Sequence, residues 1–120
     1  MKYECVLCIV NEGFSDTVMD AAKTAGARGG TVLHARGTGA REAETFFGIT
    51  VQEEKEIVMI LIPAELKAEV LHALYHAVGL HTPGQGIAFA LPVDDVVGID
   101  STGAAAADGS AAQKSEKKKK

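Results

Sequence analysis

Two short glycine-rich turns are the segments of this 120-residue chain best suited to bind a ligand. Gly37-Thr38-Gly39 directly follows a predicted strand, and Gly84-Gln85-Gly86 directly precedes another. Glycine reaches backbone conformations closed to other residues, and successive backbone N–H groups in such a turn can form a concavity that binds anions. The turns therefore predict a site for a small anion. The alternative is that both glycine pairs only shape tight turns.

A stripe of carboxylates and imidazoles on a predicted helix is a second candidate for chemistry. Glu65, Glu69, His72 and His76 are spaced by four, three and four residues, so they share one face. Two histidines four residues apart on a helix can bind a divalent metal ion. Any surface helix carries a polar stripe, however, so the sequence favours a solvated face and predicts no metal site. Metal binding stays the alternative.

The cysteines and the remaining polar groups form no recognisable catalytic set. Cys5 and Cys8 have the CxxC spacing of redox and metal sites. Residues three apart on a strand point to opposite faces, whereas a redox pair opens a helix, so we interpret both as small buried residues. Asp94-Asp95 is interpreted as the start of a turn. The chain is predicted not to be an enzyme.

Alternating strands and helices carry these groups. Period-two alternation predicts a strand over residues 2–10, and Ser15 is a suitable helix N-cap, with Phe14 and Met19 as a hydrophobic staple. The other predicted elements are a short helix ending near Gly26, strands at residues 31–36, 54–62 and 87–91, and an amphipathic helix over residues 64–78. Residues 37–53 are predicted to form a long loop.

This order predicts an α+β, ferredoxin-like βαββαβ fold, with a four-stranded antiparallel sheet, two helices on one face and a long loop between strands 2 and 3. Such a sheet leaves its other face bare. Residues 57–62 are apolar at positions facing both sides, so the bare face is predicted to be apolar as well. An apolar face must be buried by association, which predicts a homo-oligomer.

The order and spacing of these motifs resemble the P-II family of signal-transduction proteins, which are trimers of ferredoxin-like subunits that bind adenine nucleotides between subunits. The resemblance covers residues 2–100. Thr31-Val32 through Gly37-Thr38-Gly39 is similar to the strand before the family's long T-loop. Gly84-Gln85-Gly86 with Phe89 and Leu91-Pro92-Val93 is similar to its B-loop and the strand that follows.

The resemblance implies a ligand site built from both turns. In the family, the glycines that match Gly37 and Gly39 form the root of the T-loop, and those that match Gly84 and Gly86 wrap the nucleotide phosphates with backbone N–H groups. Thr31 matches a residue that lies against the nucleoside. The resemblance further implies a homotrimer, an adenine nucleotide as effector, and a membrane transporter or a metabolic enzyme as target.

Three positions depart from the family's pattern. Ile87 stands where the family has a lysine, and Gly98 and Asp100 stand where it has two arginines. Their loss removes about three charge-assisted contacts to a polyphosphate, each worth roughly 1.5 to 3 kcal/mol. Arg36 or Arg41 could partly substitute, which suits a nucleoside monophosphate, a cyclic nucleotide or another small metabolite. The alternative is that both arginines are solvated at a loop root. The candidate ligand residues are Thr31, Arg36, Gly37, Thr38, Gly39, Arg41, Gly84, Gln85 and Gly86.

The segment that matches the T-loop is shorter than in the family and has no tyrosine, so nucleotidylation of a tyrosine cannot occur there. Phe46 and Phe47 are the candidate partner-binding residues, because aromatic side chains carry much of the energy of protein interfaces. The alternative is that they fold back onto their own subunit.

Charge and composition narrow the choice of partner and compartment. Residues 1–100, predicted to be one domain, carry a net charge of −7, and residues 101–120, rich in alanine, glycine and lysine, carry +3 and are predicted to be disordered. An acidic domain argues against nucleic-acid binding. Without a secretory pattern or an apolar run of membrane-spanning length, the chain is predicted to be cytoplasmic.

Two hypotheses of different class follow. The first is a P-II-like regulator that binds a small effector between subunits and acts through the loop of residues 39–53. The second is a ferredoxin-like trimer that binds a divalent metal ion, similar in architecture to CutA-type proteins, through His72 and His76.

Overall fold

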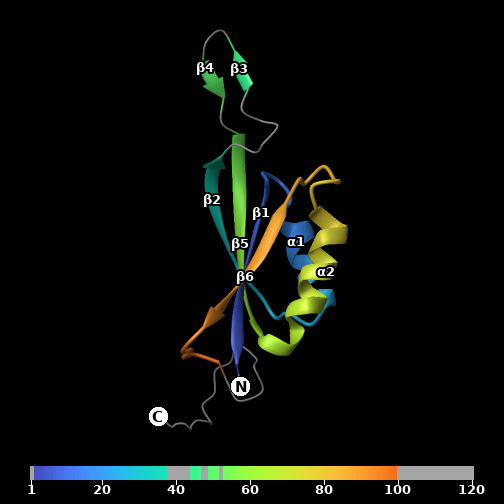
Figure 1. Cartoon of the computed structure of the whole chain (residues 1–120), viewed down its shortest axis with the longest axis vertical. Coiled ribbons are helices and arrows are strands. Elements are labelled where there is room, and N and C mark those ends of the chain that lie inside the picture. Colours follow the sequence, from blue (N-terminus) through green and yellow to red (C-terminus); the bar gives the residue numbers. More distant parts are fainter. Residues whose placement is uncertain (1, 38–43, 47–48, 52, 100–120) are drawn as a thin grey trace.

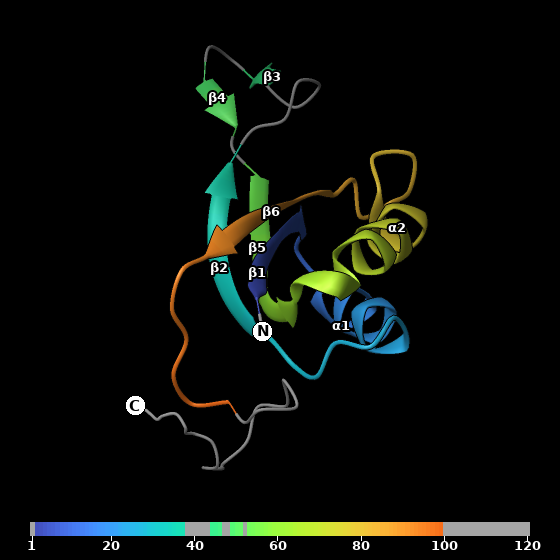
Figure 2. The ribbon, with the colours of Figure 1, turned by 60° about the horizontal axis from the view of Figure 1, so that its bottom comes forward.

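The computed structural model describes residues 2–37, 44–46, 49–51 and 53–99. In chain order, its elements are β1 (Tyr3–Asn11), α1 (Ser15–Thr24), β2 (Thr31–Gly37), β3 (Glu44–Phe46), β4 (Ile49–Val51), β5 (Glu53–Pro63), a 3₁₀ turn η1 (Ala64–Leu66), α2 (Lys67–Val78) and β6 (Ile87–Val93). Both helices lie on one side of the main sheet, as two views of the ribbon agree (Figures 1 and 2). None of the helices in these residues is long and apolar enough to cross a membrane.

The main sheet has four strands in the order β2-β5-β1-β6, and every neighbouring pair is antiparallel. This topology confirms the predicted ferredoxin-like βαββαβ fold. The prediction of an unbroken loop over residues 37–53 was wrong in one respect, because β3 and β4 pair there as a small antiparallel sheet. Strands of three residues are too short to give a readable alternation. Figure 1 shows this small sheet projecting beyond β2 and β5.

The core lies between the main sheet and the two helices. Alternate residues of β1 and β5 face the helices because successive strand side chains point to opposite sides. The buried residues contributed by the strands and helices are Val6, Cys8, Val10, Val18, Ala22, Val58, Ile60, Ile62, Val70, Leu74 and Val78. Cys5 and Cys8 are free thiols on opposite faces of β1. Cys8 is buried in this core, as predicted, but the prediction that Cys5 is also buried was wrong, because Cys5 lies on the open face and is only half-buried.

The other face of the main sheet carries no helix and is apolar. The strand register places partners in rows across it, such as Leu33, Ile57, Ile9 and Ile87. The large hydrophobic side chains exposed on this open face are Leu33, Met59, Leu61, Ile87, Phe89 and Leu91. A contiguous apolar surface of this kind is typical of an interface.

The start of α1 differs from the sequence prediction. Phe14 occupies the N-cap position without a side-chain cap, so the assignment of Ser15 as N-cap was wrong. Instead, the Glu56 carboxylate accepts hydrogen bonds from the backbone N–H groups of Gly13 and Ser15, both at 3.2 Å. A carboxylate at a helix N-terminus satisfies free amides and complements the helix dipole. Residue 56 of β5 therefore fixes the helix end, which no local pattern around Ser15 could indicate.

Candidate functional site

Gly37, the described residue of the first glycine turn, lies at the same end of the main sheet as the second turn. Gly37, the last residue of β2, pairs with Glu53 at the start of β5. At that end, the backbone N–H of Asn11 on β1 donates to the carbonyl of Gly84 at 2.9 Å. Within one subunit, Gly37 is on β2 and the second turn precedes β6, so the strands β5 and β1 lie between them.

Asn11 joins the second turn to the root of the β2–β5 connection. Its side-chain amide donates to the carbonyl of Pro83 at 3.0 Å, and its side-chain oxygen accepts from the Nζ of Lys55 at 2.8 Å. Lys55 pairs with Asn11 across the strands, so both residues lie on the open face. Lys55 is buried there, with 9% of its surface exposed. The sequence reasoning missed both residues because they are 44 positions apart and form no motif.

The backbone of the second turn is held mainly by its own subunit. Gln85 has a φ of 47°, in the left-handed region. Its N–H donates to the carbonyl of Thr82 at 3.0 Å, and the N–H of Gly86 donates to the carbonyl of Val78 at 2.6 Å. In the described part of the chain, Gly84 is the member of this turn whose N–H has no protein acceptor. The turn therefore offers an anion fewer amides than its three residues suggest.

Close packing explains the glycine at position 86. A Cβ there would lie 2.7 Å from both a methyl carbon of Val10 and the carbonyl oxygen of Val78, and 3.3 Å from the carbonyl oxygen of Ile9. Real Cβ contacts do not reach such distances, so any larger residue must displace backbone. Gly86 is therefore needed for the fold whether or not it binds a ligand. This supports, for Gly86, the alternative that the glycine only shapes a tight turn.

The structure spreads the other candidate residues over β2. Thr31 begins the strand and pairs with Met59 on the open face, six residues from Gly37, which is roughly 20 Å along a strand. Arg36 lies on the helix-bearing face, where its Nε is 3.3 Å from a carboxylate oxygen of the exposed Glu54. Four predicted residues, Thr38, Gly39, Arg41 and Phe47, lie outside the described residues, as does Asp100, and the side chain of Phe46 is not described.

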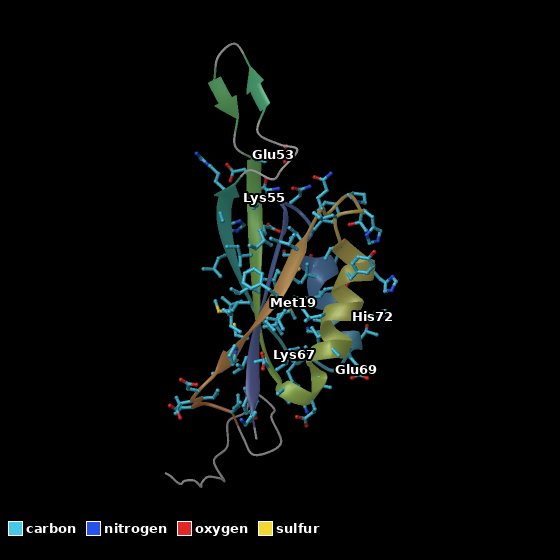
Figure 3. The ribbon with its side chains drawn as sticks, viewed as in Figure 1. Met19, Glu53, Lys55, Lys67, Glu69 and His72 are labelled. Carbon is cyan, nitrogen blue, oxygen red and sulfur yellow. The ribbon has the colours of Figure 1, made fainter. Side chains whose placement is uncertain are left out.

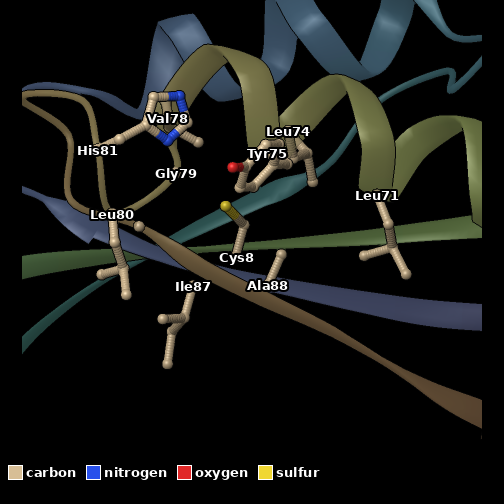
Figure 4. A pocket seen from close by; sticks show the side chains of 11 residues that line it. Cys8, Leu71, Leu74, Tyr75, Val78, Gly79, Leu80, His81, Ile87 and Ala88 are labelled. Atoms are coloured by element: carbon tan, nitrogen blue, oxygen red, sulfur yellow. The ribbon is translucent and has the colours of Figure 1, made fainter.

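A cavity of about 450 Å³ lies beside the second turn, between α2 and β6 (Figure 4). Its lining is largely apolar and includes Leu74, Ile87 and the buried Cys8, and it shares Gly86 with the turn. Burial raises the pKa of the Cys8 thiol to about 11. A protonated, buried thiol is a poor nucleophile. Most of this cavity is on the helix-bearing side of the edge strand β6, Ile87 of the open face borders it, and Lys55 is not among its lining residues.

The fold defines a ferredoxin-like subunit, with Gly37 and the turn of residues 84–86 at one end of its main sheet. Residues 4–102 match the model of the family described as Nitrogen regulatory protein P-II, and this chain belongs to that family. The resemblance found in the sequence is thereby confirmed. P-II proteins are regulators and not enzymes, which agrees with the absence of a predicted catalytic set.

Solved structures show the same fold at low sequence identity. GlnK of B. subtilis matches with a TM-score of 0.62 at 15% identity, over 84% of this chain and 93% of that one. CPII, a PII-like protein of Thiomonas intermedia K12 solved with ADP, AMP and bicarbonate, matches with a TM-score of 0.60 at 15% identity, over 78% and 91%. A Bacillus cereus protein related to NIF3 gives 0.60 at 22% identity, over 78% of this chain but 26% of that longer one. The curated proteins contain no match.

Proposed function

We propose that this chain is a cytoplasmic P-II-like regulator that assembles as a homotrimer and binds an adenine nucleotide or a related anion between subunits. It would act on a membrane transporter or a metabolic enzyme through the segment of residues 39–53. The observation that supports this is that Gly37, Lys55 and the second turn lie at one end of the sheet, where Asn11 contacts Lys55 and Pro83, beside an open face that another copy would cover. The nucleotides bound to the Thiomonas protein support an adenine ligand.

The charges at this sheet end favour a ligand with few phosphates. Lys55 and Arg36 are the described cations nearest the turns, and each already has a partner, in Asn11 and Glu54 respectively. Ile87, at the family's lysine position, presents an exposed apolar side chain. Each missing charge-assisted contact costs about 1.5 to 3 kcal/mol, or roughly a tenfold or greater loss of affinity. We therefore expect AMP or a cyclic nucleotide to bind at least as tightly as ATP.

Signalling would proceed through the chain segment that joins β2 and β5. Lys55 lies three residues after residue 52, so a ligand that engages its ammonium group also contacts the root of the loop. A ligand shifts an equilibrium of the loop only by its difference in affinity for the two states. Phe46 and Phe47 remain the candidate anchors for a target protein.

Calorimetric titration with AMP, ADP, ATP, cyclic AMP and bicarbonate tests the proposal. Lys55→Met removes the charge at similar length and should weaken binding at least tenfold. Lys67→Met is the matched control, because Lys67 pairs with Glu4 at the opposite end of β1, with the two charged atoms 3.8 Å apart. A lack of heat with every ligand, or equal effects of the two substitutions, would contradict the proposed site. Light scattering on the same samples measures whether the chain is a trimer.

A further inference from the structure

We propose that His72 and His76 on the outer face of α2 form a binding site for one divalent late transition-metal ion, with Ni²⁺, Cu²⁺ and Zn²⁺ as the cations it fits. Both side chains are exposed, so neither imidazole has to be uncovered before it can coordinate. Nothing in the proposed effector site uses them, because that site is at the sheet end and on the open face. The inference therefore stands independently of the proposed function.

The distance between the two rings matches that of imidazoles bound to one ion. The ring centroids of His72 and His76 are 4.5 Å apart, with an angle of 75° between the ring planes. With metal–nitrogen bonds of about 2.0 to 2.1 Å, a ring centroid lies roughly 3.2 Å from the metal, so two cis imidazoles have centroids about 4.5 to 5.2 Å apart. The observed value is at the right-angled end of that range, which suits square-planar or octahedral ions such as Cu²⁺ and Ni²⁺. Two histidines four residues apart on one helix face can each direct one ring nitrogen at a shared ion.

The electrostatic setting also favours a cation. His76 lies in the last turn of α2, where the helix dipole is negative. Glu69, one turn before His72 on the same stripe, adds a nearby carboxylate, and Figure 3 shows both side chains on the side of α2 away from the sheet. Within the described residues, no group of three or more metal-ligating side chains is gathered. The site is thus a two-imidazole site, in which water takes the remaining coordination positions of the bound ion.

His81 provides a matched control. It is exposed like the pair, but its ring contacts Tyr75, with centroids 4.9 Å apart, and is not part of the His72–His76 contact. Alanine is the best helix former, so His72→Ala and His76→Ala on an exposed helix face should leave the fold intact. Circular dichroism of each variant verifies this.

The test is a calorimetric titration of the full chain with Ni²⁺ and, separately, with Zn²⁺. We expect one Ni²⁺ per chain, a loss of at least tenfold in affinity for each of His72→Ala and His76→Ala, and a change of less than twofold for His81→Ala. With Cu²⁺, electron paramagnetic resonance should show coupling to two nitrogen nuclei, reduced in either variant of the pair. Unchanged affinity in both variants of the pair, or an equal loss in His81→Ala, would overturn the proposal. Titration of the same variants with AMP separates the two sites, because nucleotide binding should not change.

Discussion

Replacing Glu56 by alanine should destabilise the subunit strongly, because this carboxylate holds the start of α1. The Glu56 side chain is 9% exposed and accepts hydrogen bonds from the backbone N–H groups of Gly13 and Ser15, at 3.2 Å each. The substitution leaves both amides without that acceptor and removes a negative charge from the helix N-terminus. A hydrogen bond to a charged group contributes about 1.5 to 3 kcal/mol, and loss of an N-cap about 1 to 2 kcal/mol. Since both contacts are long, we expect a total loss of about 2 to 4 kcal/mol.

Glu54→Ala is the control for this experiment. Glu54 lies two residues away on the same strand and the same face, but its contact with Arg36 is exposed to solvent. Exposed ion pairs contribute about 0 to 1 kcal/mol. Ser15→Ala is a second control, because the Ser15 side chain does not cap the helix and should cost less than about 0.5 kcal/mol.

Urea and thermal unfolding at one fixed protomer concentration measure these differences, since association makes the apparent stability depend on concentration. A loss of 2 to 4 kcal/mol in a domain of this size lowers the melting temperature by about 10 °C or more. If Glu56→Ala unfolds within about 0.5 kcal/mol of the unsubstituted chain, or no earlier than Glu54→Ala, the capping role is refuted.

Three further substitutions test other parts of the structure. Gly86→Ala should cost about 1 to 3 kcal/mol or more in urea unfolding, since the new Cβ would lie 2.7 Å from a core valine methyl and a helix carbonyl oxygen, whereas Gly29→Ala meets open space and should be tolerated. Between pH 9 and 11, the free energy of unfolding should fall, because the pKa of the Cys8 thiol is raised to about 11 in the folded chain and unfolding at these pH values releases its proton. Cys8→Ala should remove up to about 2.7 kcal/mol of that decrease, and an unchanged pH dependence would contradict the burial of the thiol. Phe89→Lys places a charge on the open face and should shift the oligomer to smaller species in light scattering; an unchanged mass with an intact fold would show that this face is not the interface.

The fold could be predicted from the sequence because its elements carry local, periodic patterns. The alternation along β1 and the spacing of four residues between Val70, Leu74 and Val78 on α2 indicate the buried faces directly. The glycine turns can also be recognised from the local sequence. So can the end of β2 and the start of β5, because the strand patterns stop and resume there. What local patterns could not give is the exposure of each apolar residue on the open face, which depends on the strand register.

The contacts that build the candidate site join residues far apart in the chain. Asn11, Lys55 and Pro83 lie on three different segments, and only the antiparallel pairing of β1 with β5 brings the first two together. The capping role of Glu56 could not be predicted from the sequence either. A charged residue at the start of an apolar strand suggests a solvated strand end, not a buried helix cap. The glycine at position 86 was identified as notable from sequence, but its packing against the core required the structure.

Hydrogen exchange of the backbone amides with and without AMP is the most direct test that the two turns share one effector site. If they do, AMP should slow exchange at Gly84, at residues 35–37 and at residues 53–55 together, with the same midpoint concentration for all three segments. Slowed exchange at only one of the two turns, or none at either with AMP, ADP and ATP in turn, would contradict the shared site.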